Sequence, residues 1–302
     1  MPNNAASPDL KLAFEALNGK TIWYSTLMKY AEGDQPIVYS TERLRTTFQN
    51  INARFCQNWC SVVVNSVNDR LVLQGWDTGD ETTNKLLSDL WSEQHLMIES
   101  DDAHWAALVT HESFIIVWPD EETKQPEVYY NDPRLCHVFY KSENPRLKRF
   151  AAKWFIDEDK YCRMTLYYPD RLEYYRADKA GTPSNAEAFI PENPSSAANP
   201  YGVVPVFHLR MKRRSTAGEL VDIISLQDAV NKLLADMMVA AEYGAFKQRW
   251  IISNSETSDL KNAPNIVWEI PAGDGIGQGS SVGQFEATDL GVFLTAIDKL
   301  AN

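Results

Sequence analysis

The sequence predicts an α+β fold: a mixed α/β body with an antiparallel sheet, followed by a helical hairpin that carries a small β unit. Two observations support this prediction. Between residues 113 and 178, short segments alternate apolar and polar residues and are separated by turn residues, as antiparallel strands do. From Gly218 to Trp250 the apolar spacing instead predicts one uninterrupted helix of about 28 residues, and a shorter helix ends the chain.

The amino-terminal region is predicted to be helical. Ser7 is a good helix cap, Pro8 suits the first helical position, and Gly19 is expected to end this first helix. A second helix is expected over residues 22–31. Further on, apolar residues spaced three and four apart over residues 44–63 predict an amphipathic helix.

Residues 69–110 are predicted to combine one strand with two helices. DRLVLQGW, residues 69–76, has strand-like alternation. Helices are expected over residues 84–93 and 98–110, with Ser100 and Asp101 capping the second helix. These elements lead into the segment where most strands are predicted.

The sheet is predicted from six segments, namely SFIIVWPD, VYYND, LCHVFY, KRFAAKWFID, YCRMTLYYPD and LEYYRAD. The first two form a hairpin, and DEDK is expected to be a tight turn between the fourth and fifth. Paired tyrosines in these strands are expected to place one ring inward and one outward. The Pro-, Ser- and Asn-rich residues 179–205 are expected to be a surface connector, with the main domain boundary near His208.

The carboxy-terminal part is predicted to be a small β unit between two helices. Strands are expected over residues 249–254 and 265–271, followed by a glycine-rich loop over residues 272–283. This loop lacks the Gly-Lys-Ser/Thr pattern of a phosphate-binding loop. The final helix is expected to start at Thr288.

The long helix is amphipathic. Its apolar side consists of Ile223, Leu226, Val230, Leu233, Leu234, Met237 and Ala241, and its polar side includes Asp222, Asp228, Lys232 and Asp236. An ordinary core helix would explain this pattern, but globular helices average about 11 to 12 residues. Copies packed side by side would cover the apolar side, so the pattern favours a ring or a bundle.

The composition argues against several classes of function. A formal net charge of −12 lacks the basic footprint of a protein that grips nucleic acid. The cluster Arg210, Lys212, Arg213 and Arg214 is the exception, where contacts to phosphates or between subunits are both open. No catalytic motif, cofactor or metal site is predicted, because the carboxylates of Asp101 and Asp102 suit a helix start and the histidines are scattered.

The order of motifs resembles the portal proteins of tailed bacteriophages, particularly the siphovirus type. The resemblance is carried by WCSVVVNSVNDRLVLQGW, LLSDLWSEQHLMIESDDAHWAALVTHESFIIV, NPYGVVPVFHLR and ELVDIISLQDAVNKLLADMM, in this order. It implies a wing domain over residues 1–215, a first stem helix over 216–246, a clip over 247–286 and the start of a second stem helix over 287–302. Portal proteins continue into a tunnel loop and a crown, so the chain is expected to be a truncated version.

The resemblance also implies a function. Portal subunits form a ring, expected to be dodecameric, at one capsid vertex, through which double-stranded DNA is packaged and ejected. The implied partners are the large terminase subunit, a head-tail adaptor, the major capsid and scaffolding proteins, and DNA without sequence specificity. The protein would reside in the virion and, during assembly, in the host cytoplasm.

The resemblance assigns roles to a few residues. Asp222, Asp228, Lys232 and Asp236 would line the DNA channel, and Glu256, Asp259 and Lys261 would lie in the clip that docks terminase and adaptor. Acidic side chains would keep DNA from sticking to the channel. The alternative is a hydrolase or carbohydrate-binding protein with a helical dimerisation arm.

Overall fold

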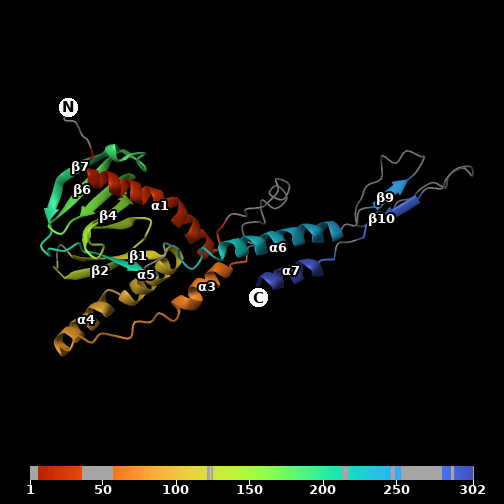
Figure 1. The fold of residues 1–302 in the computed structure, drawn as a ribbon, viewed down its shortest axis with the longest axis horizontal. Helices are drawn as coiled ribbons and strands as arrows, with labels where there is room; N and C mark the ends of the chain where they lie inside the picture. Colours follow the sequence, from red (N-terminus) through yellow and green to blue (C-terminus); the bar gives the residue numbers. More distant parts are fainter. Residues whose placement is uncertain are drawn as a thin grey trace, which may run out of the picture. The chain divides into compact units, whose positions relative to one another are not determined.

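The computed structural model describes residues 6–35, 57–120, 123, 125–212, 217–245, 249–252, 281–286 and 289–301. The chain divides into two compact units. Unit 1 consists of Met1–Gln35 and Asn58–Ile224, and unit 2 of Pro36–Gln57 and Ser225–Asn302. The fold is α+β with antiparallel sheets, as predicted (Figure 1).

Helix α1, Pro8–Glu32, is a single helix. Ser7 caps it as predicted, with its side-chain oxygen accepting a hydrogen bond from Leu10 N at 3.2 Å. The expected break at Gly19 is wrong. Apolar and polar side chains on both sides of Gly19 are buried, and this burial outweighs the cost of about 1 kcal/mol for a helical glycine. The helix ends instead at Gly33, whose φ of 82° is the left-handed conformation that glycine allows.

The next elements differ from the prediction in detail. Asn58 caps helix α3, Trp59–Asn68, so no helix continues through this position, and residues 44–56 of the expected helix lie outside the described residues. The strand expected over residues 69–76 is also wrong, because from residue 71 this segment has no secondary structure and pairs with no described strand. Helix α4, Glu81–Glu93, follows as predicted.

Helix α5, Leu96–Thr110, starts earlier than expected. His95, with φ of 53°, precedes it, so Ser100 and Asp101 lie inside the helix and do not cap it. Leu96 is buried. Its burial favours a helix that begins about one turn before Ser100 and Asp101, the polar residues from which the start was predicted.

A three-stranded antiparallel sheet follows, in the order β2-β1-β8. The predicted hairpin is confirmed as β1, Glu112–Pro119, and β2, Pro126–Asn131. Strand β8, Val206–Arg210, pairs with β1 in a register that puts His208 opposite Phe114. The chain therefore does not divide near His208, since this residue belongs to a sheet of unit 1.

A second antiparallel sheet has five strands in sequence order. They are β3 (Cys136–Tyr140), β4 (Lys148–Ile156), β5 (Tyr161–Tyr167), β6 (Arg171–Ala180) and β7 (Phe189–Ala198). The first four confirm the prediction. The fifth, preceded by the short 3₁₀ helix η2 (Ala186–Ala188), lies where a surface connector was expected. It pairs with β6 despite its prolines, which an edge strand tolerates.

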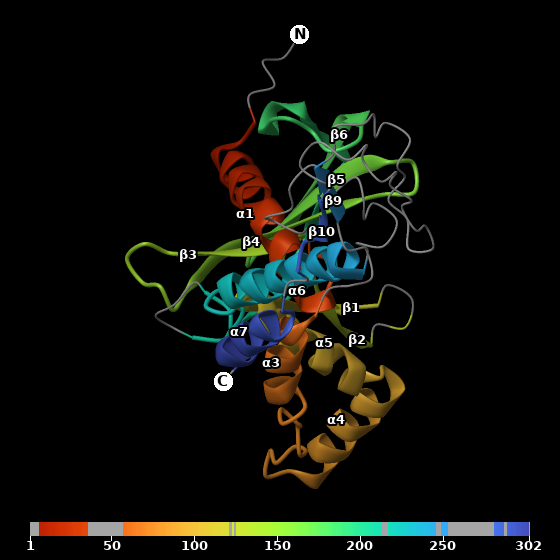
Figure 2. The same ribbon diagram turned by 90° about the vertical axis from the view of Figure 1, so that its right-hand side faces the viewer.

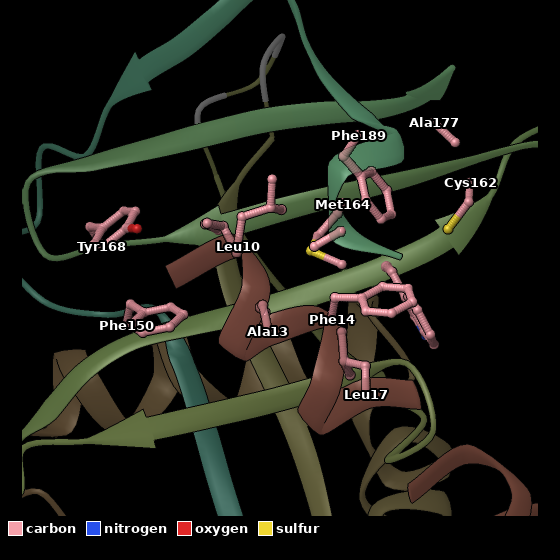
Figure 3. Close-up of a cluster of buried hydrophobic side chains, with 14 residues drawn as sticks. Leu10, Ala13, Phe14, Leu17, Phe150, Cys162, Met164, Tyr168, Ala177 and Phe189 are labelled. Atoms are coloured by element: carbon pink, nitrogen blue, oxygen red, sulfur yellow. The ribbon is translucent and has the colours of Figure 1, made fainter. Parts of the chain in front are cut away.

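Both faces of the five-stranded sheet are covered. Figure 3 shows Leu10, Phe14 and Leu17 of α1 against Phe150, Met164 and Phe189 of the sheet, and these side chains belong to one buried cluster. A second cluster, including Phe114 and Val138, connects the two sheets. Tyr167 belongs to the second cluster and Tyr168 to the first, so the rings of this pair do point to opposite faces. Neither ring faces solvent, because a further layer covers each side.

Unit 2 contains α6 (Ile224–Ala245), β9 (Arg249–Ile252), β10 (Ser281–Gln284) and α7 (Gly291–Ala301). Strands β9 and β10 pair antiparallel, so residues 281–283 of the expected glycine loop form a strand. The strand expected over 265–271 lies outside the described residues. The final helix is confirmed, starting at Gly291.

The long helix starts six residues later than predicted, at Ile224 and not at Gly218. Residues 217–223 belong to unit 1 and pack on α5. Glu219 N–H donates to Leu108 O at 2.9 Å, and a Cβ at Gly218 would lie 2.2 Å from Val109 O. These contacts hold the backbone in turns. With 22 residues, α6 is still about twice the average helix length.

Candidate channel and docking residues

The four predicted channel residues lie in two different environments. Asp222 is exposed in the turns before α6, whereas Asp228, Lys232 and Asp236 are half-buried on α6 itself. Lys232 and Asp236 form an ion pair one helical turn apart. Their charges are therefore already balanced, and such pairs contribute only about 0.3–0.5 kcal/mol.

The two sides of α6 do not follow the predicted division. Val230, on the predicted apolar side, is buried, but Leu226 is 44% exposed. Two polar residues of α6, Gln227 and Asn231, are also buried, because both bind the backbone of Gln57. Gln227 Nε2 donates to Gln57 O at 2.6 Å, and Gln57 N donates to Asn231 Oδ1 at 3.0 Å. The side-chain amides of Gln227 and Asn231 thus bind both the backbone N–H and the backbone C=O of Gln57. The spacing of apolar residues along α6 did not indicate this contact.

The predicted basic cluster is described only in part. Arg210 is the last residue of β8, exposed, with its guanidinium 5.4 Å from the ring centre of Tyr140. Lys212 forms an exposed ion pair with Glu219 at 3.2 Å. The other predicted contact residues, Arg213, Arg214, Glu256, Asp259 and Lys261, lie outside the described residues.

A buried polar cluster inside unit 1 was not predicted. Its centre is Glu112, the first residue of β1, whose side chain is 4% exposed. Lys20 Nζ of α1 lies 2.9 Å from Glu112 Oε1, and Tyr24 OH donates to the same oxygen at 2.9 Å. His208 Nε2 of β8 lies 2.9 Å from the second oxygen, Oε2. Two elements far apart in sequence therefore meet at one carboxylate.

More partners surround this centre. Lys20 Nζ also donates to Cys136 O at 2.5 Å and lies 3.3 Å from His137 Nδ1. Tyr24 OH is 3.2 Å from His111 Nδ1, and Tyr140 OH is 3.1 Å from His208 Nδ1. Three of the five histidines of the chain thus gather around Glu112. The cluster joins α1 to both sheets.

Burial and neighbouring charges shift the pKa values in this cluster. Burial alone would raise the pKa of Glu112, but the contacts with His208 and Lys20 hold it well below its usual range. Burial lowers the pKa of Lys20 despite the nearby Glu112. Burial and the Lys20 charge lower the pKa of His137 to about 4, so His137 is neutral at physiological pH.

The sequence offered little to find this cluster. Lys20, Glu112 and His208 lie far apart in the sequence and form no recognisable motif. Between α5 and β1, His111 adopts the left-handed conformation with φ of 76°, and Glu112 follows it. The one sequence feature that could have indicated a buried carboxylate is Glu112 itself, a charged residue at the start of the mostly apolar segment ESFIIV.

The remaining sites considered from the sequence are structural. Asp101 Oδ1 accepts a hydrogen bond from Asn68 Nδ2 at 2.7 Å, which joins α5 to α3. Cys60, Cys136 and Cys162 are buried free thiols. Within the described parts of the chain, no group of side chains suits a metal ion. A search of the same residues finds no helix with the length and hydropathy of a membrane span.

The ion pairs at Glu112 are buried, whereas the ion pair of Lys212 with Glu219 lies at the surface. Unit 1 is α+β, and unit 2 combines helices with a two-stranded antiparallel sheet. The model of the family described as "Phage portal protein, SPP1 Gp6-like" matches residues 19–301, so the chain belongs to this family. A search of curated proteins finds no match.

Family membership defines the role of the protein at a coarse level. It is a bacteriophage portal protein of the capsid vertex, with a structural role in DNA packaging. The family is structural and not enzymatic, and it assembles as an oligomeric ring together with capsid and packaging machinery.

Proposed function

We propose that this chain is the subunit of a homo-oligomeric ring that conducts double-stranded DNA during packaging and ejection. Residues 1–215 would be the wing, 216–246 the first stem helix, 247–286 the clip and 287–302 the start of the second stem helix. The observation that carries this proposal is the order of elements in unit 2, where α6 and α7 flank the antiparallel pair β9–β10. This is the order expected for a stem hairpin with a clip at its end.

The channel would be lined by α6 and the turns before it. Asp222, Asp228 and Asp236 would face DNA, with Lys232 reducing their charge. Each phosphate neutralised by Lys or Arg adds affinity through counterion release, and a conduit must avoid such retention. An acidic lining repeated around a ring would therefore favour sliding. The net charge of −12 agrees with this requirement.

The other partners would bind the clip and the wing. The large terminase subunit and the head-tail adaptor would dock on the clip, where Glu256, Asp259 and Lys261 lie in the sequence. The major capsid and scaffolding proteins would contact the wing. Arg210, Lys212, Arg213 and Arg214 would contact DNA phosphates or a neighbouring subunit, and the exposed guanidinium of Arg210 is available for either.

The mass of the purified protein tests the ring. Light scattering of the full chain at several concentrations should give a large oligomer, and electron microscopy should show rings with a central hole. A protein that stays monomeric or dimeric at high concentration would contradict the proposal.

The channel lining is tested by reversing charge. In a packaging assay with rings, Asp228→Lys together with Asp236→Lys should slow DNA translocation several-fold and most strongly at low salt, because added phosphate contacts are screened by salt. The matched control is Asp159→Lys with Asp178→Lys, which makes the same charge change at exposed positions of unit 1. Equal translocation rates for both variants would argue against an α6-lined channel.

A further inference from the structure

One part of unit 1 exposes an unusual amount of apolar surface. We define the acidic arm as residues 59–98, which comprise α3, the segment that connects it to α4, α4 itself and the first residues of α5. Helix α4 contains no buried residue. Six large apolar side chains of the arm are between 51% and 67% exposed, namely Val62, Val72, Leu73, Leu86, Met97 and Ile98. Exposed apolar side chains gathered in one stretch of chain are a feature of interaction sites.

The arm is nevertheless held in place on its inner side. Gln94 Nε2 donates to Pro126 O at 2.6 Å, and Val128 N donates to Gln94 Oε1 at 2.9 Å. The side-chain amide of Gln94 thus pairs with the edge of β2 as a strand would. The rings of Trp76 and Trp91 meet edge to face at 5.6 Å. The arm is therefore fixed to β2 through Gln94, while its apolar side chains named above remain exposed to solvent.

The arm is also negatively charged. It contains six acids, Asp69, Asp77, Asp80, Glu81, Asp89 and Glu93, against Arg70 and Lys85, so its formal charge is 2 − 6 = −4. Among the described residues, none of these acids lies within ion-pair distance of a cation. A partner for this surface should therefore be apolar and basic.

Such a surface exists elsewhere on unit 1. The β3–β4 hairpin, residues 141–149, contains Lys141, Arg146, Lys148 and Arg149 against Glu143, a formal charge of 4 − 1 = +3. Arg149 pairs with Asp9, and Lys148 Nζ donates to Val206 O at 2.6 Å. Lys141 and Arg146 are exposed and, within the described part of the chain, have no acidic partner.

An apolar groove lies beside this hairpin. It has a volume of about 230 Å³ and is lined by residues that include Trp118, Tyr201, Val203 and Phe207. Lys148 connects hairpin and groove, because its Nζ lies 4.4 Å from the ring centre of Phe207. We call the hairpin and the groove together the basic groove. Tyr201, Val203 and Phe207 are each about half exposed.

We propose that the acidic arm of one subunit docks on the basic groove of the next subunit. The inference rests on the proposed ring and specifies which surfaces form it. A ring needs two unlike, complementary faces on every subunit. The arm and the groove match in charge and in apolar character. Figure 2 shows α4 and the β3–β4 hairpin extending to different sides of unit 1, as a head-to-tail contact requires.

The size of the arm suits such a contact. Each of the six exposed apolar side chains would bury roughly 60 Å², or about 350 Å² together. Since apolar atoms make up a little over half of an interface, the arm would bury about 600 Å² per partner. A standard interface buries about 800 Å² per partner. In a ring every subunit makes this contact twice, which adds to its strength.

Charge reversal in two variants tests the contact. The arm variant is Asp89→Lys with Glu93→Lys, and the hairpin variant is Lys141→Glu with Arg146→Glu. All four side chains are exposed, so circular dichroism should show native folding. Each variant alone places like charges opposite each other. At low salt, half-assembly measured by light scattering should require at least tenfold more protein than for the wild type.

Mixing the two variants gives the decisive readout. In a 1:1 mixture, each reversed arm meets a reversed hairpin and each native arm meets a native hairpin, so rings should form again. The control Asp159→Lys with Asp178→Lys should assemble like the wild type. The inference is wrong if the arm and hairpin variants also assemble like the wild type, or if the mixture does not recover. A wild-type protein that forms no ring would instead refute the proposed function.

A crosslink provides an independent measurement. Leu86→Cys combined with Val203→Cys should give a ladder of covalent oligomers under mild oxidation of assembled rings. Ile190→Cys combined with Val203→Cys is the control, because Ile190 is also exposed but lies on β7. Rings that give no ladder with the first pair, or equal ladders with both pairs, would overturn the proposed contact and leave the ring itself standing.

Discussion

The two halves of α1 stabilise unit 1 in different ways. The first half contributes Leu10, Phe14 and Leu17 to an apolar cluster against the five-stranded sheet. The second half contributes Lys20 and Tyr24 to the polar cluster at Glu112, in addition to Leu27 and Met28 in another apolar cluster. Apolar burial gains free energy almost regardless of the partner, whereas a buried charge requires specific partners. The polar cluster at Glu112 therefore fixes how α1 and the two sheets meet, and its loss should cost the most.

Removing the buried cation should have the largest effect. Lys20→Met leaves the Glu112 carboxylate buried without its cation, and we expect the free energy of unfolding to fall by about 3–5 kcal/mol. Chemical denaturation of the two proteins measures this change. Lys11→Met on the same helix is the control, because its ion pair with Glu187 is half exposed, and it should cost less than about 1 kcal/mol. Equal losses of unfolding free energy in Lys20→Met and Lys11→Met would show that the buried ion pair at Glu112 contributes no more than a surface ion pair.

An apolar truncation in the other half of α1 should have a similar or smaller effect. Leu17→Ala removes a fully buried side chain and should lower the free energy of unfolding by about 2–5 kcal/mol, depending on how far the cavity collapses. Leu12→Ala, at a position that is 41% exposed, should cost less than about 1 kcal/mol. A loss at Leu17 no larger than at Leu12 would contradict the core described for α1.

Between pH 7 and pH 5, acidification should act on the polar cluster at Glu112. The pKa of His137 is about 4 when folded and about 6.5 when unfolded, so the unfolded state binds more protons between these values. Stability should therefore fall as the pH drops, by just under about 2 kcal/mol from pH 7 to pH 5. Below about pH 4.5, protonation of Glu112, whose pKa is also lowered, adds in the same direction.

Thermal unfolding at several pH values measures this dependence. His137→Gln keeps a polar side chain but cannot titrate, so it should flatten the profile between pH 7 and pH 5. His95→Gln, at an exposed position, is the control and should leave the profile unchanged. An unaltered profile in His137→Gln would show that Glu112, Lys20, His111 or His208, which surround His137, causes the dependence.

The smallest effect is expected on α6. Lys232→Ala removes an ion pair with Asp236 that is a third to a half exposed, and should change the free energy of unfolding by less than about 0.5 kcal/mol. Chemical denaturation at low and high salt provides the measurement. A loss above 1 kcal/mol would indicate that Lys232 contributes more than this surface pair.

Local signals predicted much of the fold but not its long-range contacts. Ser7 and Pro8 marked the start of α1, and alternation located six strands, because caps and pleats depend on near neighbours in sequence. Gly19 was misinterpreted because burial on both sides overrides its low helix propensity. Gly218 was misinterpreted because the backbone of Val109, distant in sequence, lies against it.

The candidate site shows the same limit. The sequence placed Asp228, Lys232 and Asp236 on one helix, as the structure does, but it could not indicate that Gln57 holds the same helix. It also predicted a strand over residues 69–76, from an alternation that the isolated subunit leaves unpaired. In the proposed ring, exposed apolar residues of this segment such as Val72 and Leu73 would contact the basic groove of the next subunit.

The sequence by itself determined the family, the α+β class and the order of helices and strands, since these follow from local patterns and their succession. Only the tertiary structure decided that Lys20, Glu112 and His208 meet in the interior of unit 1. The physical reason is that a buried charge is stable only beside partners that the fold brings from distant positions, and no spacing in the sequence encodes that encounter.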